Sequence, residues 1–302
     1  MINVVLTGAT GFVGRNFTKH FQNNKQIALQ ALNVRAGISS GDLAAADVVI
    51  HLAGKAHDLK KTSDDSEYFK VNTDLTKVLF DHFLKSNARD FIYFSSVKAV
   101  ADTVKDVLTE NAPANPLTPY GRSKHLAEQY LESQVLPEGK RLFILRPCMI
   151  HGPGNKGNLN LLYQVVSKGV PYPLAAFHNS RSFLSIANLC YVTERLISDQ
   201  TISGGVYNLA DDQALSTNEL ITVISEALGR RPKLLKINVG LIKGLASIGD
   251  KLHLPLNTER LTKLTENYVV SNAKIKAALK INSFPTTSKE GLTRTIKSFI
   301  AS

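Results

Sequence analysis

The chain has 302 residues, enough for about two domains of ordinary size, and 43% of them are hydrophobic. Its 36 lysines and arginines outnumber its 25 acidic residues, giving a net charge of +11. No run of five or six basic residues is present, so we expect no nucleic-acid partner, while the diffuse positive charge suits a substrate that carries phosphates.

The cysteines and the apolar segments indicate the compartment. Cys148 and Cys190 are too few for a disulfide framework. The apolar start at 2–6 is short and has no basic leader, so we expect no signal peptide. No apolar stretch approaches 18 residues. We therefore expect a cytoplasmic protein without a membrane partner.

The N-terminal segment has the pattern of a dinucleotide-binding site. A predicted buried strand at 2–6 leads into Gly8, Gly11 and Gly14, and a helical pattern then continues to residue 21. In this context the first glycine permits a tight turn, the second lets the backbone approach a pyrophosphate, and the third lets the helix pack closely on the strand. The free N–H groups at the start of the helix favour the same anion.

The end of the second predicted strand, 27–34, indicates which dinucleotide binds. NAD sites usually place an acid there on the ribose 2′-hydroxyl, whereas an arginine accommodates a 2′-phosphate. This strand carries no acid and runs into Arg35, which favours NADP; NAD stays possible, because Arg35 can also lie in solvent. Asp42 and Leu43 follow a Gly/Ser-rich turn and are expected near the adenine, unless Asp42 is a plain turn residue.

The remaining elements predict the fold class. Ala53 and Gly54 are small residues at a strand end, where a cofactor can lie against the backbone. Strands and helices alternate over the first 150 residues, which is typical of a Rossmann-type doubly wound parallel sheet in an α/β protein. The later elements in this half are strands at 47–52, 91–95 and 141–146, a helix at 66–85 that contains Asn72, a proline-rich loop at 101–119, and a helix from Tyr120.

Prolines and glycines between Pro147 and Gly157 mark a domain boundary. We expect a dinucleotide-binding domain at 1–150 and a smaller α+β substrate domain at 151–302, with some segments possible in either. The second half predicts helices at 159–168 and 186–198, strands at 206–209 and 232–237, a helix from the capping box at Ser216 to just before Gly229, and further helices to the end.

Tyr120 and Lys124 lie one turn apart on the same face of their predicted helix. A lysine cation favours the phenolate, and moving a phenol pKa from about 10 to near 7 takes about 4 kcal/mol, which we expect the lysine to supply with the help of a bound cationic cofactor. The pair is therefore a candidate for proton transfer, although the same spacing occurs in many ordinary helices.

Several motifs in order resemble the extended short-chain dehydrogenase/reductases, specifically their nucleotide-sugar epimerase/dehydratase/reductase group. The resemblance covers nearly the whole chain. The motifs are Thr7-Gly-x-x-Gly-x-x-Gly14, His51-Leu-Ala-Gly54, Ser95-Ser96, Tyr120-x-x-x-Lys124, Leu145-Arg146-Pro147, the segment 181–189, and Ser271-Asn272-Ala273-Lys274.

The resemblance implies a mechanism. Tyr120 exchanges a proton with a sugar hydroxyl or ketone, nicotinamide exchanges a hydride with the same carbon, and Lys124 holds the cofactor ribose and lowers the tyrosine pKa. A hydroxyl normally binds the reacting oxygen, but its usual position is Val97 here, so either Ser96 or Ser95 supplies it.

The resemblance also implies the binding residues, with Arg181 on the pyrophosphate of a nucleotide-diphosphate sugar, expected to be a UDP-sugar. We expect no metal site, because the histidines are scattered and no ligand spacing recurs; a homodimer is possible. The expected cofactor residues are Gly8, Gly11, Phe12, Val13, Gly14, Arg35, Asp42, Leu43, Leu52, Ala53, Gly54, Asn72, Tyr120, Lys124 and Pro147. The expected substrate residues are Ser96, Asn158, Leu159 and Arg181.

Three functions remain open. The favoured one is an NADPH-dependent reductase of a 4-keto nucleotide sugar, which Arg35 and the absent acid support. The motif Ser95-Ser96-Val97-Lys98 also resembles a branch that makes N-acetylated deoxysugars for surface polysaccharide. The second is a UDP-sugar 4-epimerase with tightly bound NAD. The third is a non-catalytic NADP-sensing regulator, which is disfavoured because such proteins typically lose the tyrosine or the lysine.

Overall fold

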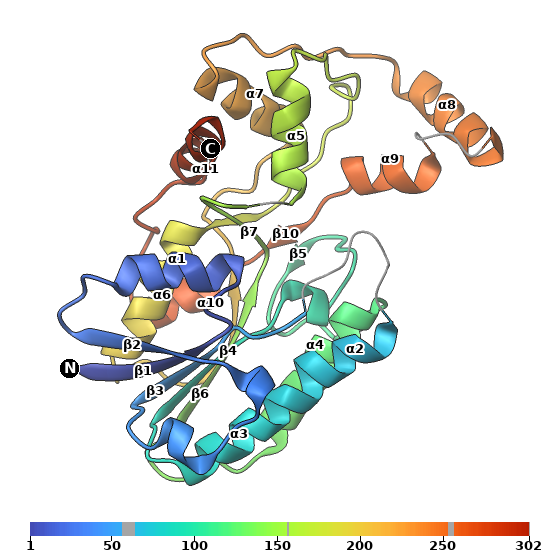
Figure 1. Cartoon of the computed structure of the whole chain (residues 1–302). Coiled ribbons are helices and arrows are strands. Elements are labelled where there is room, and N and C mark those ends of the chain that lie inside the picture. Colours follow the sequence, from blue (N-terminus) through green and yellow to red (C-terminus); the bar gives the residue numbers. More distant parts are fainter. Residues whose placement is uncertain (56–63, 156, 253–256, 302) are drawn as a thin grey trace.

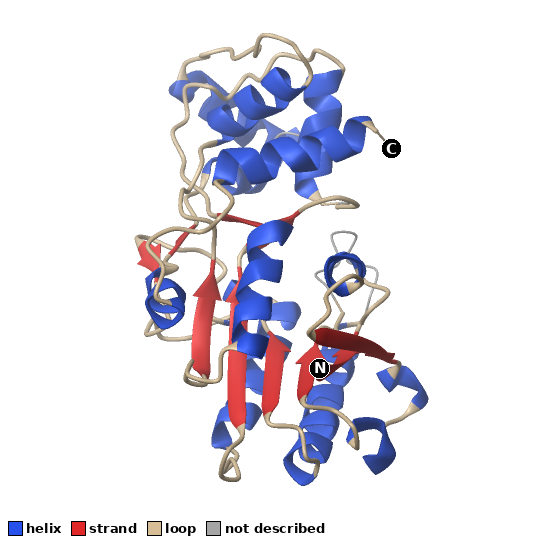
Figure 2. Ribbon diagram, turned by 90° about the vertical axis from the view of Figure 1, so that its left-hand side faces the viewer, coloured by secondary structure: helices blue, strands red, loops and turns tan. Residues whose placement is uncertain are grey.

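The computed structural model describes residues 1–55, 64–155, 157–252 and 257–301. Six parallel strands form its central sheet, and their carboxyl ends face the second lobe of the molecule (Figure 2). In sheet order they are β2 (Ile27–Leu32), β1 (Ile2–Thr7), β3 (Val48–His51), β4 (Asp90–Phe94), β6 (Arg141–Pro147) and β9 (Gly205–Leu209).

Helices cover both faces of this sheet (Figure 1). Alternate strand residues point to opposite faces, so Val4 and Leu6 pack on one side and Val5 on the other. The first face is covered by α1 (Phe12–Phe21), α6 (Ile186–Ser198) and α10 (Ala273–Leu279), and the second by α3 (Leu75–Lys85) and α4 (Pro119–Ser133). The doubly wound, Rossmann-type fold class is confirmed.

The order of the sheet fixes where a ligand can bind. β1 lies between β2 and β3, so the chain winds away from β1 in opposite directions. A crevice opens at the carboxyl ends of strands where the winding changes direction. Residues after β1 and β3 therefore line the same place.

Two predicted elements differ from the structure near this crevice. The strand expected at 27–34 ends at Leu32, because the Asn33 side chain accepts a hydrogen bond from Arg35 N and starts a 3-10 turn. The helix expected at 66–85 is interrupted. It consists of α2 (Asp65–Phe69), a π-helical segment (Lys70–Asp74) and then α3.

The C-terminal lobe is mostly helical. One small core lies among α5 (Asn158–Ser167), α7 (Thr217–Ala227) and α11 (Ser288–Ile300), and another lies under α8 (Val239–Leu252) and α9 (Thr258–Thr265). Two short parallel pairs lie between the sheet and these helices. They are β7 (Met149–His151) with β8 (Phe183–Ser185), and β5 (Val107–Leu108) with β10 (Val269–Val270).

The strand expected at 232–237 is wrong. This segment makes only isolated bridges, Tyr172 with Leu234 and Leu174 with Lys236. The first bridge is parallel and the second is antiparallel, so the two cannot belong to one continuous ladder.

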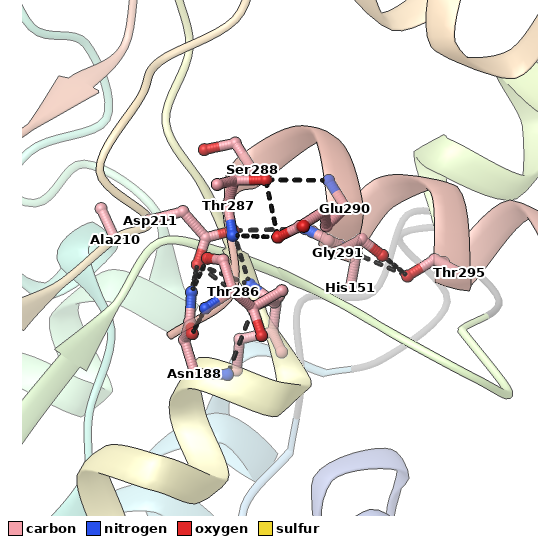
Figure 3. A network of polar contacts seen from close by, with 12 residues as sticks. His151, Asn188, Ala210, Asp211, Thr286, Thr287, Ser288, Glu290, Gly291 and Thr295 are labelled. Carbon is pink, nitrogen blue, oxygen red and sulfur yellow. Dashed lines mark hydrogen bonds and ion pairs between the residues drawn. The ribbon is translucent and has the colours of Figure 1, made fainter. Parts of the chain in front are cut away.

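A buried polar network joins the lobes (Figure 3). The Asp211 carboxylate follows β9 and accepts hydrogen bonds from Ser185 N at 3.0 Å and from Asn188 Nδ2 at 2.7 Å. Asn188 also donates to Thr286 O, close to the start of α11. These contacts fix the C-terminal lobe above the carboxyl edge of the sheet.

Candidate active site

The glycine turn after β1 is closely packed against the end of β3. Gly8 has a positive φ of 72°, and a Cβ there would lie 2.6 Å from Ala53 N. A Cβ on Gly14 would lie 2.3 Å from Gly8 O. Gly11 precedes α1 without a side-chain cap, so the N–H groups of Phe12 and Val13 lack intrahelical acceptors. This cradle fits the pyrophosphate of a dinucleotide, which needs close backbone and free donors.

A buried chain of hydrogen bonds supports the floor of the crevice. Ala53 N donates to Thr7 Oγ1, which contacts His51 Nδ1 at 2.7 Å, and His51 Nε2 contacts Thr76 Oγ1 at 2.9 Å. Thr76 in turn donates to Asn72 O. With each hydroxyl donating once, His51 carries its proton on Nε2. Burial, helped by the charge of Lys124, lowers the pKa of His51 to about 3, so this histidine is a neutral structural group.

Asn72 connects the end of β3 to the helix that carries Tyr120. Its Oδ1 accepts from Lys55 N at 2.7 Å, while its Nδ2 donates to Lys55 O and to Ser123 Oγ. Ser123 also donates to Tyr120 O. Asn72 lies in the π-helical segment, and such segments often occur at functional sites. The structure therefore places Asn72 as a positioning residue for α4.

The side chains of Tyr120 and Ser96 meet at the carboxyl edge of the sheet. Burial raises the pKa of the Tyr120 phenol, a hydrogen bond with the Ser96 side chain lowers it, and the neighbouring Tyr68 raises it. The Tyr68 and Tyr120 rings are 6.3 Å apart in an edge-on arrangement. In the part of the chain that the structure describes, the buried Ser95 Oγ has no hydrogen-bond partner. Of the two candidate serines, Ser96 is the one that faces the phenol.

Lys124 is buried beneath this pair. Its Nζ donates to Phe94 O at 2.7 Å and lies 4.8 Å from the centre of the Tyr93 ring. Burial lowers the pKa of Lys124 to about 8, and the charge of Glu128 opposes that change. In the protein alone, burial is the largest effect on the Tyr120 phenol and raises its pKa, whereas the lowering expected from the sequence also relies on the charge of a bound cofactor.

The Lys124 ammonium is also close to the end of β3. A Cβ on Gly54 would lie 2.9 Å from Asn72 Oδ1 and 3.3 Å from Lys124 Nζ. Gly54 therefore lets the backbone pass next to both polar side chains. The structure brings Ala53, Gly54, Asn72 and Lys124 together, as one wall of the crevice.

The residues expected around the adenosine lie beside β2. Arg35 is exposed in the turn that follows the β2 end, and Leu32 pairs with Thr7 across the sheet. Asp42 accepts from Ser39 N and Oγ, which lowers its pKa and makes it a turn residue. The Leu43 side chain is 1% exposed and belongs to the core, so only its backbone can reach a ligand.

The structure does not bring all the residues expected to hold substrate to one place. Arg181 Nη1 donates to Lys263 O, and Nη2 lies 3.6 Å from a carboxylate oxygen of Glu266. Leu159 is 3% exposed in the core of the C-terminal lobe. Asn158 begins α5, and its side chain lies outside the described residues. Leu52 and Pro147 are half-buried and buried at the ends of β3 and β6, respectively.

Two charged groups near the site did not follow from sequence reasoning. The buried Glu128 accepts hydrogen bonds from Arg146, and Lys55 forms an ion pair with Glu67 while lying 5.5 Å from the Tyr68 ring. The four-residue spacing between Lys124 and Glu128 was a usable signal, since such pairs face each other on a helix. No sequence spacing connects Lys55 to Tyr68.

Three further properties concern the described part of the chain. It contains no cluster of three or more histidine, cysteine, aspartate or glutamate side chains able to bind a metal ion. None of its helices has the length and hydropathy needed to cross a bilayer. Cys148 and Cys190 are both buried as free thiols.

Known proteins resemble this chain in sequence and in fold. A UDP-glucose 4-epimerase of Vibrio cholerae is 29% identical, with 99% of this chain and 95% of that protein aligned. An N-acetyl-alpha-D-glucosaminyl-diphospho-ditrans,octacis-undecaprenol 4-epimerase of Escherichia coli O157:H7 is 28% identical, covering 98% and 94%. The solved structure of MoeE5 with UDP-glucose and NAD superposes with a TM-score of 0.76 over 99% of both chains, at 18% identity, and so shows the same fold.

The family model described as "NAD dependent epimerase/dehydratase family" matches residues 4–210, which include the glycine turn, Ser96, Tyr120 and Lys124. This match covers more than half of the chain and contains the crevice described above. The protein is an enzyme that belongs to the NAD-dependent epimerase/dehydratase family.

Proposed function

We propose that this enzyme transfers a hydride and a proton at C4 of a sugar carried on a nucleoside diphosphate. The observation that supports it most is the contact between the Tyr120 phenol and the Ser96 side chain above the buried Lys124. A bound nicotinamide dinucleotide supplies or takes up the hydride. Tyr120 exchanges the proton with the sugar oxygen, and Ser96 orients that oxygen through a hydrogen bond.

Reduction of a 4-keto sugar is the favoured direction. A phenol whose pKa is 10 or higher carries its proton at neutral pH, so Tyr120 can supply the proton that a ketone oxygen needs. The hydride adds to C4, the Tyr120 proton goes to the ketone oxygen, and the product is a 4-hydroxyl. This reaction consumes one reduced cofactor per sugar.

NADPH is the favoured cofactor, because of the residues in the turn after β2. This turn presents Arg35 in solvent and no carboxylate, and the nearby Asp42 is hydrogen-bonded within its own turn. A guanidinium can form a charge-assisted hydrogen bond with a 2′-phosphate, worth about 1.5–3 kcal/mol. That corresponds to roughly ten- to a hundredfold preference for NADP over NAD.

A second candidate is 4-epimerisation, which the two relatives catalyse by name. In that reaction the enzyme keeps NAD bound, takes the hydride from C4 and returns it to the opposite face, with no net oxidation. Tyr120 would then act first as a base. We further propose a UDP-sugar as substrate, with Arg181 near its diphosphate, and a homodimer as the oligomeric state.

The cofactor distinguishes the two reactions. We expect the purified protein to release little NAD and to bind NADPH at least ten times more tightly than NADH. Arg35→Ala should lose that preference. The control Lys297→Ala, which changes an exposed cation on α11, should retain it. NMR of UDP-N-acetylglucosamine incubated with the enzyme should then show no 4-epimer. Retained NAD together with a 4-epimer would instead establish the epimerase.

A further inference from the structure

Helix α8 exposes an apolar stripe that the core of the protein does not use. Leu241, Leu245 and Ile248 are 58%, 48% and 51% exposed. Their spacing of four and three residues places them on one face of the helix. Ile242 and Ala246, on the neighbouring face, are buried in the small core of α8 and α9. The hydrophobic side of α8 therefore extends well beyond its contact with the lobe.

The chain around this stripe is positively charged. Residues 227–249 contain five cations and no aspartate or glutamate; the cations are Arg230, Arg231, Lys233, Lys236 and Lys243. All five are exposed, and none forms an ion pair with a carboxylate of the described residues. Leu235, which is 48% exposed, lies directly beside Lys236. Apolar and cationic side chains are thus interspersed in the segment that precedes α8.

The segment before α8 also borders a hollow large enough for a polar headgroup. A pocket of about 490 Å³ is lined by Arg230, Arg231 and Lys233 together with Val166 and Val170. Arg230 Nη1 donates to Ser167 O, which holds its guanidinium at the rim without neutralising it. The pocket combines cations with an apolar wall.

The apolar stripe of α8 and the cations around it together indicate which kind of partner binds this surface. Two copies of the chain that met through α8 would bring like charges together, which opposes association. An anionic bilayer satisfies both features, since interfacial helices bury an apolar face below lipid headgroups while flanking lysines and arginines bind the negative surface. We propose that α8 and the basic stretch 230–236 form a peripheral docking surface for an anionic lipid bilayer.

The position of α8 agrees with this role. Figure 1 shows α8 at the outer edge of the C-terminal lobe, with α9 between it and the sheet. Arg181 donates to a carbonyl at the end of α9, so docking through α8 brings the junction of the lobes near the membrane surface. This proposal replaces the expectation of no membrane partner. It does not depend on which reaction Tyr120 catalyses.

Co-sedimentation with lipid vesicles tests the proposal. The full-length protein should bind vesicles of equal parts phosphatidylglycerol and phosphatidylcholine about tenfold or more tightly than pure phosphatidylcholine, and salt should weaken the binding. Leu241→Ser/Leu245→Ser should lower that affinity about tenfold or more, and so should Lys236→Gln/Lys243→Gln. Since all four side chains are exposed, these variants should keep the thermal stability of the wild type.

Val135→Ser, which changes a 91% exposed apolar residue after α4, is the matched control and should bind vesicles like the wild type. The proposal is overturned if the protein does not bind the anionic vesicles, or if the α8 variants bind them as well as the control. It is equally overturned if sedimentation shows a dimer that Leu241→Ser/Leu245→Ser dissociates, because the stripe would then be an interface between two copies.

Discussion

Glu128 and Arg146 form a buried two-pronged ion pair one helical turn along α4 from Lys124. Arg146 Nη2 lies 2.7 Å from Glu128 Oε2, and Arg146 Nε lies 3.0 Å from Oε1. Arg146 comes from β6, so the pair also joins the helix to the sheet. Glu128 raises the pKa of Lys124 against the effect of burial. Two cations therefore share one carboxylate below the candidate site.

Removing that carboxylate should destabilise the protein strongly. Glu128→Gln leaves the Arg146 guanidinium buried without an anion, a change that typically costs about 3–5 kcal/mol. We expect chemical denaturation to show such a loss, and Glu128→Gln/Arg146→Met to recover most of it. Glu138→Gln, at an exposed position in the turn after α4, serves as the control. Equal stability of Glu128→Gln and this control would contradict the argument.

Tyr120→Phe should remove the proton donor and little else. General acid–base catalysis is worth about 100-fold or more, so we expect turnover to fall by at least that factor. Cofactor affinity, measured by titration, should stay close to that of the wild type. Turnover near the wild-type rate would remove Tyr120 from the mechanism.

Ser96 and Ser95 should respond differently to the same substitution. Ser96 interacts with the phenol, and its Oγ also accepts from Lys98 N, so Ser96→Ala should lower turnover about tenfold or more, while Ser96→Thr restores part of it. Ser95 has a buried hydroxyl without a partner among the described residues. Ser95→Ala should therefore leave turnover almost unchanged. The reverse pattern in steady-state rates would assign the hydroxyl to Ser95.

His51 should make the fold sensitive to acid. Its pKa is lowered from 6.5 to about 3 in the folded protein, so below pH 6.5 the unfolded chain binds more protons at this site. The contribution of neutral His51 to the free energy of unfolding is thus fully present above pH 6.5. It decreases by about 1.4 kcal/mol per pH unit as the pH falls toward 3.

Thermal melts at pH 7 and pH 5 measure this effect. We expect His51→Gln to melt lower than the wild type at pH 7, because Thr7 and Thr76 lose their shared partner. The difference between the two pH values should shrink in that variant and persist in His178→Gln, which changes an exposed histidine. An unchanged difference in His51→Gln would show that other groups carry the acid sensitivity.

The sequence predicted the parallel sheet well because its signals are local. A strand such as 2–6, a glycine turn and a helix follow one another directly, and each has its own residue pattern. The failures have two causes. Asn33 ended β2 early through a local side-chain hydrogen bond with Arg35 N. The segment 232–237 meets the distant segment 172–174 through one parallel and one antiparallel bridge, a geometry that no local residue pattern indicates.

In the candidate site, too, local sequence patterns predicted some features and missed those that depend on the folded structure. The spacing of Tyr120 and Lys124 predicted one face of a helix, and both residues lie in α4. The choice between Ser95 and Ser96 needed the turn that follows β4, because a shift of one residue reverses which way a side chain points. Asn72 is joined to Lys55 and Ser123 across long stretches of chain, and no pattern in one sequence encodes those partners.

The strand β9 has a consequence for biosynthesis. It pairs with β6 only after the chain has passed through β7, α5, β8 and α6, so a nascent chain that has just completed β6 has an unpaired, apolar edge on its sheet. Such edges favour pairing with other chains. Aggregation should therefore compete with folding until residues 205–209 have left the ribosome, and a fragment ending at residue 150 should be insoluble even though it contains the whole glycine turn and both Tyr120 and Lys124.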